Sequence, residues 1–416
     1  MRKTLNIFVP HCSGMLTDHQ PHGDGLVAYG FIKRLAERGH SLFVVAENVN
    51  LSTPLPDNVH LFPIQYRFRS SALNRLDYMM QLRSLYHRLQ RVVHFDLVHQ
   101  LNPVYTGITL ALWPLNVPVV LGPYVADWPA NPDAISSSRS SVSSILRRVK
   151  RAAAHLQQKR ATALLLTTEA ARDRLVNSDP RGKLTYILPH GIDSDFFCPS
   201  PGRPLRSESS VVILFLANIS ERKGIFDLLV AFDRIAAKFP GATLLIAGGG
   251  EHEQDASKLA SGLACARQIH FLGRQTRQQA LEAFRNADIY CLPSHGEPFG
   301  MTVAEAMSCG LPVVVTNAGG VRWIVDDDGG LRVPERSPED LARALSELLL
   351  DPGRRQTMGA HNRAKVLKLF TWERVIDQLE EIYTQSLRIR KRADLGEVRD
   401  PGRISNDAPQ EVSAYE

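Results

Sequence analysis

The segment ADIYCLPSHGEPFGMTVAEAMSCGLPVVVTN, residues 287–317, alternates between strand-like and helix-like composition. Residues 287–294 form an apolar run rich in β-formers, long enough for one buried strand. Glycine and proline are frequent in 295–300, and they continue neither a helix nor a strand. Residues 301–308 are helix formers with apolar side chains on one face. A second apolar strand follows over 312–317. The order strand, turn, helix, strand predicts one repeat of a parallel α/β sheet.

Two glutamates flank the predicted start of this helix. Glu297 stands in the turn, and Glu305 stands eight positions later within the helix. Between them, the main-chain N–H groups of Gly300, Met301 and Thr302 form an open helix N-terminus, which favours an anion such as phosphate. Carboxylates, in turn, accept hydrogen bonds from sugar hydroxyls. The combination fits a nucleotide sugar, although two such glutamates also occur as solvated carboxylates beside an ordinary turn.

Residues 297–315, E-P-F-G-M-T-V-A-E-A-M-S-C-G-L-P-V-V-V, resemble the E-x7-E signature of retaining glycosyltransferases of the family-4 type, also called glycosyl transferases group 1. This resemblance implies an α/β chain of the GT-B fold, with two doubly wound Rossmann-like domains and an interdomain cleft. It implies transfer of a sugar from a nucleoside diphosphate sugar to a hydroxyl of a glycan or lipid-linked acceptor, with retention of configuration and no protein nucleophile. Glu297 would hold the donor sugar, Glu305 the ribose, and Phe299 would belong to the donor site.

The resemblance extends to further donor-binding residues. F-L-A-N-I-S-E-R-K-G, residues 215–224, matches a family segment in which Arg222 and Lys223 would neutralise the diphosphate. The family often carries an arginine at the position of Asn218 here. Both cations also fit a solvated loop. Leu272 and Gly273 lie in a region that lines the nucleobase in the family.

Candidate residues also occur in the first half of the chain. Gly23 and Gly25 would approach the donor phosphate in a protein of this family, and their distance from the first strand argues against a dinucleotide-binding fingerprint. His99 lies in the acceptor-side segment D-L-V-H-Q-L-N-P, where relatives carry a second histidine at the position of Leu101. His99 is a candidate catalytic residue, but a lone histidine at a strand end is more often structural.

The chain of 416 residues is long enough for two domains. Apolar runs alternate with helical patterns in both halves, which predicts parallel sheets covered on both faces. The predicted organisation is an N-terminal domain over 1–195, a linker over 196–210, a donor-binding domain over 211–370, a helix over 371–387 that packs back on the first domain, and a disordered tail over 388–416.

Composition narrows the function classes. The five cysteines are scattered and form no C-x-x-C pair, so neither a disulfide framework nor a zinc site is expected. No apolar run approaches the length needed to span a bilayer, and a cytoplasmic protein is expected. Residues 1–195 hold 22 Lys and Arg against 14 Asp and Glu, but no RNP-like or helix-turn-helix signature is present. No nucleic-acid partner is therefore predicted.

Three further features leave alternatives open. Asp326-Asp327-Asp328 has the composition of a solvated turn rather than a cation site, so no metal is expected to be required. The helical pattern over 142–161 is basic and apolar, which fits either an anionic membrane surface at the inner face or an ordinary packed helix. The departures at Asn218 and Leu101 support a rival hypothesis: a non-catalytic protein of the same fold that binds nucleotide sugars or a partner.

Overall fold

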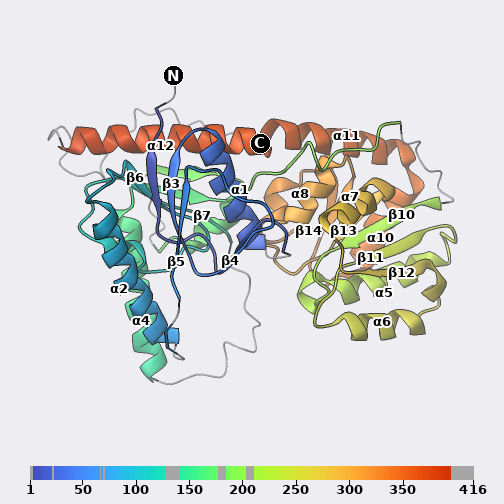
Figure 1. Ribbon diagram of the computed structural model, residues 1–416. Coiled ribbons are helices and arrows are strands. Elements are labelled where there is room, and N and C mark those ends of the chain that lie inside the picture. Colours follow the sequence, from blue (N-terminus) through green and yellow to red (C-terminus); the bar gives the residue numbers. More distant parts are fainter. Residues whose placement is uncertain are drawn as a thin grey trace. The chain divides into compact units, whose positions relative to one another are not determined.

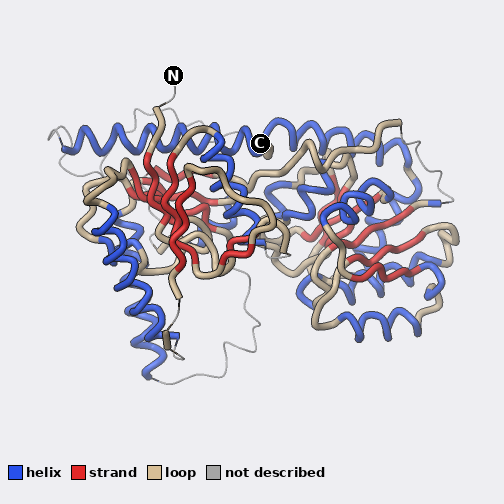
Figure 2. Tube along the Cα trace, in the orientation of Figure 1, coloured by secondary structure: helices blue, strands red, loops and turns tan. Residues whose placement is uncertain are grey.

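The computed structural model describes residues 3–20, 23–65, 67–68, 71–126, 141–176, 184–202 and 210–394. The chain forms two compact units (Figure 1). The first comprises Met1–Gly191 and Val375–Glu416, and the second comprises Ile192–Arg374. Each unit contains one large parallel sheet flanked by helices (Figure 2).

The sheet of the first unit has seven strands in the order β5-β3-β1-β6-β7-β8-β9. Its strands are β1 (Asn6–Val9), β3 (Ser41–Ala46), β5 (Val59–Pro63), β6 (Leu97–Gln100), β7 (Val119–Tyr124), β8 (Ala163–Leu166) and β9 (Leu184–Ile187). The short strands β2 (Leu16–Thr17) and β4 (Val49–Asn50) pair separately. The helices are α1 (Gly23–Glu37), α2 (Ser71–Leu89), α4 (Ser141–Arg160) and α12 (Trp372–Asp394), with 3₁₀ turns η1 (Thr109–Leu112) and η2 (Glu169–Arg174).

The C-terminal helix α12 packs against the first unit. Its residues Ile376, Leu379 and Tyr383 are fully buried. The Glu380 carboxylate lies 3.0 Å from Nε2 of His40, which joins α12 to the end of α1. The chain therefore returns to its first unit after completing the second.

The sheet of the second unit has six strands in the order β12-β11-β10-β13-β14-β15. Its strands are β10 (Val212–Leu216), β11 (Thr243–Ala247), β12 (Ile269–Gly273), β13 (Ile289–Leu292), β14 (Val313–Thr316) and β15 (Gly330–Val333). The helical elements are η4 (Glu221–Lys223), α5 (Ile225–Ala236), α6 (Glu253–Gly262), η5 (Ala266–Gln268), α7 (Arg277–Asn286), α8 (Met301–Ser308), α9 (Val321–Ile324), α10 (Pro338–Leu350) and α11 (Pro352–Leu369).

Strands β13 and β14 of the second unit are buried along their whole length. All four residues of both β13 and β14 are buried, and Tyr290 pairs with Val313 in parallel register. Continuous apolar strands are needed here because helices cover both faces of the sheet. Chain order reverses between β10 and β13, so the sheet has a topological switch point at which ligands bind outside the carboxyl ends of the strands.

The predicted boundary at the start of the second unit differs from the structure, in which this unit begins at Ile192. The linker was predicted from residue 196, but Phe197 is buried and lies edge-on to Phe284 with ring centroids 5.9 Å apart. The main-chain N–H of Ile192 also donates to the carbonyl of Phe370 at 2.7 Å. This tie places the start of the second unit before the predicted linker. Residues 203–209 of that linker lie outside the described residues.

The final helix is longer than predicted. It was expected over 371–387 and runs to Asp394. Charged residues continue a helix as readily as apolar ones when they lie on its solvent side, so the change in composition at 388 does not end it. Residues 395–416 of the predicted tail lie outside the described residues.

Candidate functional site

Two loops meet at the switch point of the second sheet. One follows β10 and ends in η4, and the other follows β13 and leads into α8. The N–H of His295 donates to the carbonyl of Arg222 at 2.8 Å. Gly224 has φ +72°, and a Cβ there would lie 1.9 Å from the carbonyl oxygen of Pro293. The two loops therefore touch through their main chains, and glycine is required at the point of contact.

Lys223 and Glu297, one from each loop, form an ion pair through Nζ and Oε2. Glu297 is 8% exposed, so the pair is largely shielded from water. Its position at the switch point combines a cation, which attracts phosphate, with a carboxylate, which accepts hydrogen bonds from hydroxyls. The arrangement can bind a polar ligand that carries both groups.

The N-terminus of α8 opens next to this pair in the chain. Gly300 precedes the helix at φ +91°, and no side chain caps it. The N–H of Gly320 donates to the carbonyl of Glu297 at 2.6 Å, which holds the loop in front of the helix. The uncapped N–H groups at the start of α8 carry the positive end of the helix dipole. They form an anion site beside the Glu297 loop.

Tyr290 positions the first turn of α8, a role that sequence reasoning missed. Its hydroxyl donates to the carbonyl of Leu216 at 3.0 Å and shares a hydrogen bond of 2.7 Å with the hydroxyl of Thr302. It thus joins the end of β10 to the helix N-terminus. The sequence gives no signal for this role, because a tyrosine inside an apolar strand looks like any other core aromatic. Thr302 can offer a ligand its N–H, while its hydroxyl already has a partner.

Glu305 lies on α8, half-buried and near Arg277 and Asp193. Burial raises the pKa of its carboxyl from 4.5 to about 8, against the opposing effect of Arg277. The side chain is therefore largely protonated at neutral pH when no ligand is bound. A hydroxyl that donates to Glu305 would favour its ionised form.

This shift predicts how Glu305→Gln changes stability with pH. Between pH 4.5 and about 8, folded wild-type protein keeps a proton that the unfolded chain releases. The free energy of unfolding of the wild type therefore falls as pH rises through this window. Glu305→Gln cannot titrate, so we expect it to be the more stable protein near pH 8 and to show a flatter pH dependence.

Urea unfolding of both proteins at several pH values between 5 and about 8.5 measures this difference. The matched control is Glu335→Gln, which neutralises an exposed carboxyl in the same unit. A parallel pH dependence for wild type and Glu305→Gln would contradict the prediction.

The structure places four further residues of the predicted donor site. The ring of Phe299 is buried against Phe370, with centroids 6.4 Å apart, so its side chain packs in the core. Met301 also packs against the core with its side chain. Leu272 and Gly273 end β12 at the carboxyl edge of the sheet, and Leu272 is 42% exposed. An exposed leucine at this edge suits contact with a flat apolar ring.

Both ring nitrogens of His99 have hydrogen-bond partners within the first unit. Its Nε2–H donates to the carbonyl of Gly122 at 2.9 Å, so Nδ1 accepts from the hydroxyl of Tyr383 at 2.6 Å. Burial lowers the pKa of the ring to about 4. The histidine is neutral and joins β6, β7 and α12 within the first unit. These contacts favour the structural alternative for His99 over a role as catalytic base.

The predicted glycines of the first unit stand at the start of α1. The helix begins at Gly23, and Gly25 is buried in its first turn. The carboxylate of Asp24 accepts a hydrogen bond of 2.9 Å from the amide of Asn102, which follows β6. This bond places the helix start at the carboxyl edge of the first sheet, next to its switch point between β1 and β6.

Asp326 has structural partners. His361 lies 2.9 Å from one carboxylate oxygen of Asp326 and Lys365 lies 2.6 Å from the other. Burial raises the pKa of the Asp326 carboxyl, but the hydrogen bonds from Lys365 and His361 outweigh this effect. The pKa therefore lies below its usual value. Within the described parts of the chain, no three His, Cys, Asp or Glu side chains gather in a metal-binding arrangement. None of the helices described there has the length and apolar character to cross a membrane.

Comparison with curated proteins identifies relatives among glycosyltransferases. The chain is 35% identical over 241 residues to a D-inositol 3-phosphate glycosyltransferase from Mycobacteroides abscessus, covering 55% of this chain and 52% of the relative. It is 31% identical over 210 residues to a GDP-mannose-dependent monoacylated alpha-(1-6)-phosphatidylinositol monomannoside mannosyltransferase from Corynebacterium glutamicum, covering 47% and 55%. The matches thus span about half the length of these relatives.

Solved structures share the fold across nearly the whole chain. A sucrose-phosphate synthase from Thermosynechococcus elongatus superposes with a TM-score of 0.68 at 20% identity, covering 92% of this chain and 99% of that one. The Anabaena protein HepE in complex with UDP superposes with a TM-score of 0.69 at 19% identity, covering 92% and 100%.

Two family models match consecutive parts of the chain. The model described as Glycosyltransferase Family 4 matches residues 22–196, and the model described as Glycosyl transferases group 1 matches residues 201–365. The second match contains the ion pair and the α8 N-terminus. With these matches and two parallel α/β units of the GT-B kind, the chain belongs to the family-4, group 1 glycosyltransferases.

Proposed function

We propose that the protein is a retaining glycosyltransferase that transfers a sugar from a nucleoside diphosphate sugar to a hydroxyl of a glycan or lipid-linked acceptor. The observation that carries the proposal is the Lys223–Glu297 pair, which lies at the switch point of the second sheet next to the uncapped N-terminus of α8. Family membership and the UDP complex of the structurally similar HepE support it.

Each part of the donor has a group suited to it in the second unit. Arg222, Lys223 and the N–H groups of α8 supply positive charge for the diphosphate. Glu297 accepts hydrogen bonds from the sugar hydroxyls, and Glu305 accepts from the ribose. The exposed Leu272, with Gly273, covers the nucleobase.

The proposed chemistry needs no protein nucleophile. The bond between the anomeric carbon and the diphosphate oxygen breaks, and the acceptor oxygen bonds to the same face of that carbon. The departing diphosphate oxygen takes the acceptor proton, so atoms and charge balance without a side-chain base. Lys223 and the α8 N-terminus stabilise the charge that develops on the leaving diphosphate, and binding supplies the orientation. This route agrees with the neutral, fully hydrogen-bonded state of His99.

A panel of nucleotide sugars tests the proposal. Binding of each donor by calorimetry and release of nucleoside diphosphate, with and without candidate acceptors, are measured on the full chain. One donor should bind and turn over, and the product should keep the donor's anomeric configuration by NMR. Binding of a donor without any turnover would favour the rival, non-catalytic function, and inversion of the anomeric centre would exclude the retaining mechanism.

We also predict full activity without a divalent metal. Lys223, Arg222 and the α8 N-terminus supply the positive charge that a cation would otherwise provide. Turnover after exhaustive chelation measures this, with magnesium and manganese added back as controls. Activity that disappears on chelation and returns with either metal would contradict the prediction.

A further part of the proposal is attachment of the first unit to an anionic membrane at the cytoplasmic face. Helix α4 exposes Val149, and α2 exposes Leu76 and Met80, which are 58% and 65% exposed and four residues apart. Neighbouring cations such as Arg148 would attract anionic lipid headgroups. Apolar side chains at helical spacing beside cations are typical of helices that lie on a membrane surface.

We expect weak, salt-sensitive binding to vesicles of phosphatidylcholine mixed with phosphatidylserine. Replacing both Leu76 and Met80 by serine should reduce flotation with these vesicles severalfold, since the buried apolar area is lost. Leu350→Ser, at an exposed leucine of the second unit, is the control. Equal flotation with neutral and anionic vesicles would remove this part of the proposal.

A further inference from the structure

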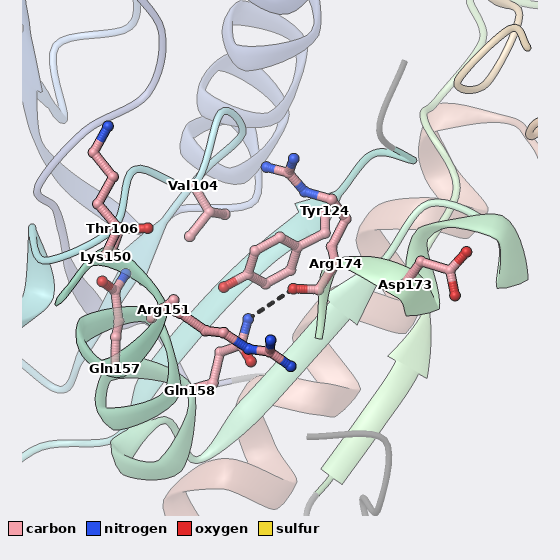
Figure 3. Close-up of a pocket in the computed structure, with 10 residues that line it drawn as sticks. Val104, Thr106, Tyr124, Lys150, Arg151, Gln157, Gln158, Asp173 and Arg174 are labelled. Atoms are coloured by element: carbon pink, nitrogen blue, oxygen red, sulfur yellow. Dashed lines mark hydrogen bonds between the residues drawn. The ribbon is translucent and has the colours of Figure 1, made fainter. Parts of the chain in front are cut away.

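A pocket of about 270 Å³ lies within the first unit, apart from every residue assigned above (Figure 3). Tyr124 ends β7, Asp173 and Arg174 end η2 after β8, and Val104 follows β6, so the pocket opens at the carboxyl edge of three adjacent strands. Its remaining wall is the second half of α4. Ligands of parallel α/β sheets bind at this edge.

The lining carries more positive than negative charge. Lys150, Arg151 and Arg174 contribute three cations, and Asp173 is the single carboxylate among the residues that line the pocket. Figure 3 shows the guanidinium groups of Arg151 and Arg174 on opposite sides of the Tyr124 ring, while the carboxylate of Asp173 is directed away from that ring. Two guanidinium forks around one cavity suit a phosphate, because each can donate two hydrogen bonds to it.

Two buried glutamines fix the wall of the pocket. Gln157 accepts a hydrogen bond from the N–H of Gly107 and donates to Gln100 at 3.0 Å. Gln158 donates to the carbonyl of Arg174 at 3.1 Å, the bond that is drawn in Figure 3, and accepts from the N–H of Val176 at 2.8 Å. These bonds tie α4 to the loops after β6 and β8, so the cations stand on a preorganised frame.

Tyr124 adds a neutral donor to the cations. Burial raises the pKa of its hydroxyl to about 12. The hydroxyl therefore stays protonated at every working pH and can donate to an anion. The volume of the pocket is below the roughly 300–1,000 Å³ of pockets that hold whole ligands, so it takes one group of a larger molecule.

We propose that this pocket binds a phosphate group of the acceptor, and that the acceptor is therefore a phosphate-bearing polyol or sugar, either soluble or as a lipid headgroup. The proposal rests on the proposed glycosyl transfer and narrows its acceptor class. Arg151 binds the phosphate, and Arg174 and Tyr124 complete its surroundings.

Calorimetry on the full chain tests the pocket without requiring turnover. Inositol 3-phosphate and inositol are the soluble probes, and vesicles with and without phosphatidylinositol are the lipid probes. Arg151→Gln should weaken binding of the phosphate-bearing probe by about tenfold or more. Arg148→Gln removes an equal charge from an exposed position on the same helix, outside the lining, and should change binding of the soluble probe by less than about twofold. With vesicles, where Arg148 is itself proposed to attract lipid headgroups, the control is Lys238→Gln, at an exposed cation of the second unit.

The soluble and the lipid probe distinguish the two possible sources of the phosphate. The source is the one whose binding is weakened by Arg151→Gln and not by the control variant. Equal losses in Arg151→Gln and in the control variant of that arm, or no preference for phosphate over inositol in either arm, would overturn the proposal. Binding of a nucleoside diphosphate is measured on the same samples and should be unchanged in Arg151→Gln. If no nucleotide sugar binds or reacts while the Arg151-dependent phosphate binding persists, the proposed function fails and the pocket stands.

Discussion

Lys223→Met is expected to reduce kcat/KM for the nucleoside diphosphate sugar by about 10²–10³-fold, the usual loss when one preorganised donor to a developing negative charge is removed. Lys223 is paired with Glu297 at the switch point, where little water reaches either group. The substitution also leaves the Glu297 carboxylate largely buried without its cation. An unpaired buried charge costs about 3–5 kcal/mol, so the variant should unfold more easily.

A double variant separates these two effects. Lys223→Met combined with Glu297→Gln removes both charges, and we expect it to regain most of the lost stability because no buried charge remains unpaired. Turnover should stay low, since the positive charge for the diphosphate is still missing. Steady-state kinetics and thermal unfolding of the wild type, Lys223→Met, Glu297→Gln and the double variant measure both quantities. Recovery of turnover together with stability would show that Lys223 only supports the fold.

The central strands of the second unit could be predicted because of their burial. Both faces of the sheet are covered there, so β10 and β13 appear in the sequence as uninterrupted apolar runs. The run over 312–317 corresponds to β14 (Val313–Thr316), and the predicted helix over 301–308 has the observed bounds of α8. Gly310 and Pro312 lie between them, and the helix ends before these residues in the structure, as the sequence predicts.

Helix α7 was not predicted, although the sequence contains its start signal. The Thr276 side chain accepts a hydrogen bond from the N–H of Gln279, and the Gln279 side chain accepts one from the N–H of Thr276, which completes a capping box. Threonine followed three residues later by glutamine is the pattern that precedes such a helix. Most residues of α7 are charged or carry amides, because only one side of the helix is buried. Its few apolar residues therefore give a weak helical pattern in the sequence.

Contacts between distant residues could not be predicted. Lys223 and Glu297 were both candidates for the donor site, but nothing in the sequence shows that they pair across 74 residues. The partner of His99 is Tyr383, which lies 284 residues later on a helix that was predicted only to pack on the first domain. Single-sequence patterns report which face of an element is buried, not which side chain of another element meets it.

The pocket of the first unit shows the same limit for charged residues. The basic pattern of α4 allowed either a membrane-facing or a packed helix, because sequence gives the charge of a helix without its surroundings. Arg148 and Arg151 are both exposed on this helix, but only Arg151 lines the pocket. One basic helix can therefore serve two surfaces.

Gly224→Ala is expected to lower the free energy of unfolding by about 3 kcal/mol or more, since a left-handed residue gains a side chain and meets main-chain atoms. Its φ is +72°, and the added Cβ would lie 1.9 Å from the carbonyl oxygen of Pro293. That carbonyl belongs to the loop that carries Glu297, so relief of the clash must separate the two loops. Donor affinity should then fall at least tenfold, because charge-assisted bonds of about 1.5–3 kcal/mol lose their geometry.

Gly202→Ala is the matched control for this substitution. Gly202 lies in the same unit at φ +68°, but nothing stands within 4 Å of the Cβ it would gain. It should therefore show only the backbone cost of about 1 kcal/mol and bind the donor normally. Calorimetric unfolding and donor titration of both variants give the comparison. Equal destabilisation would mean that backbone strain alone acts at Gly224, and that direct contact between the two loops does not hold the donor site together.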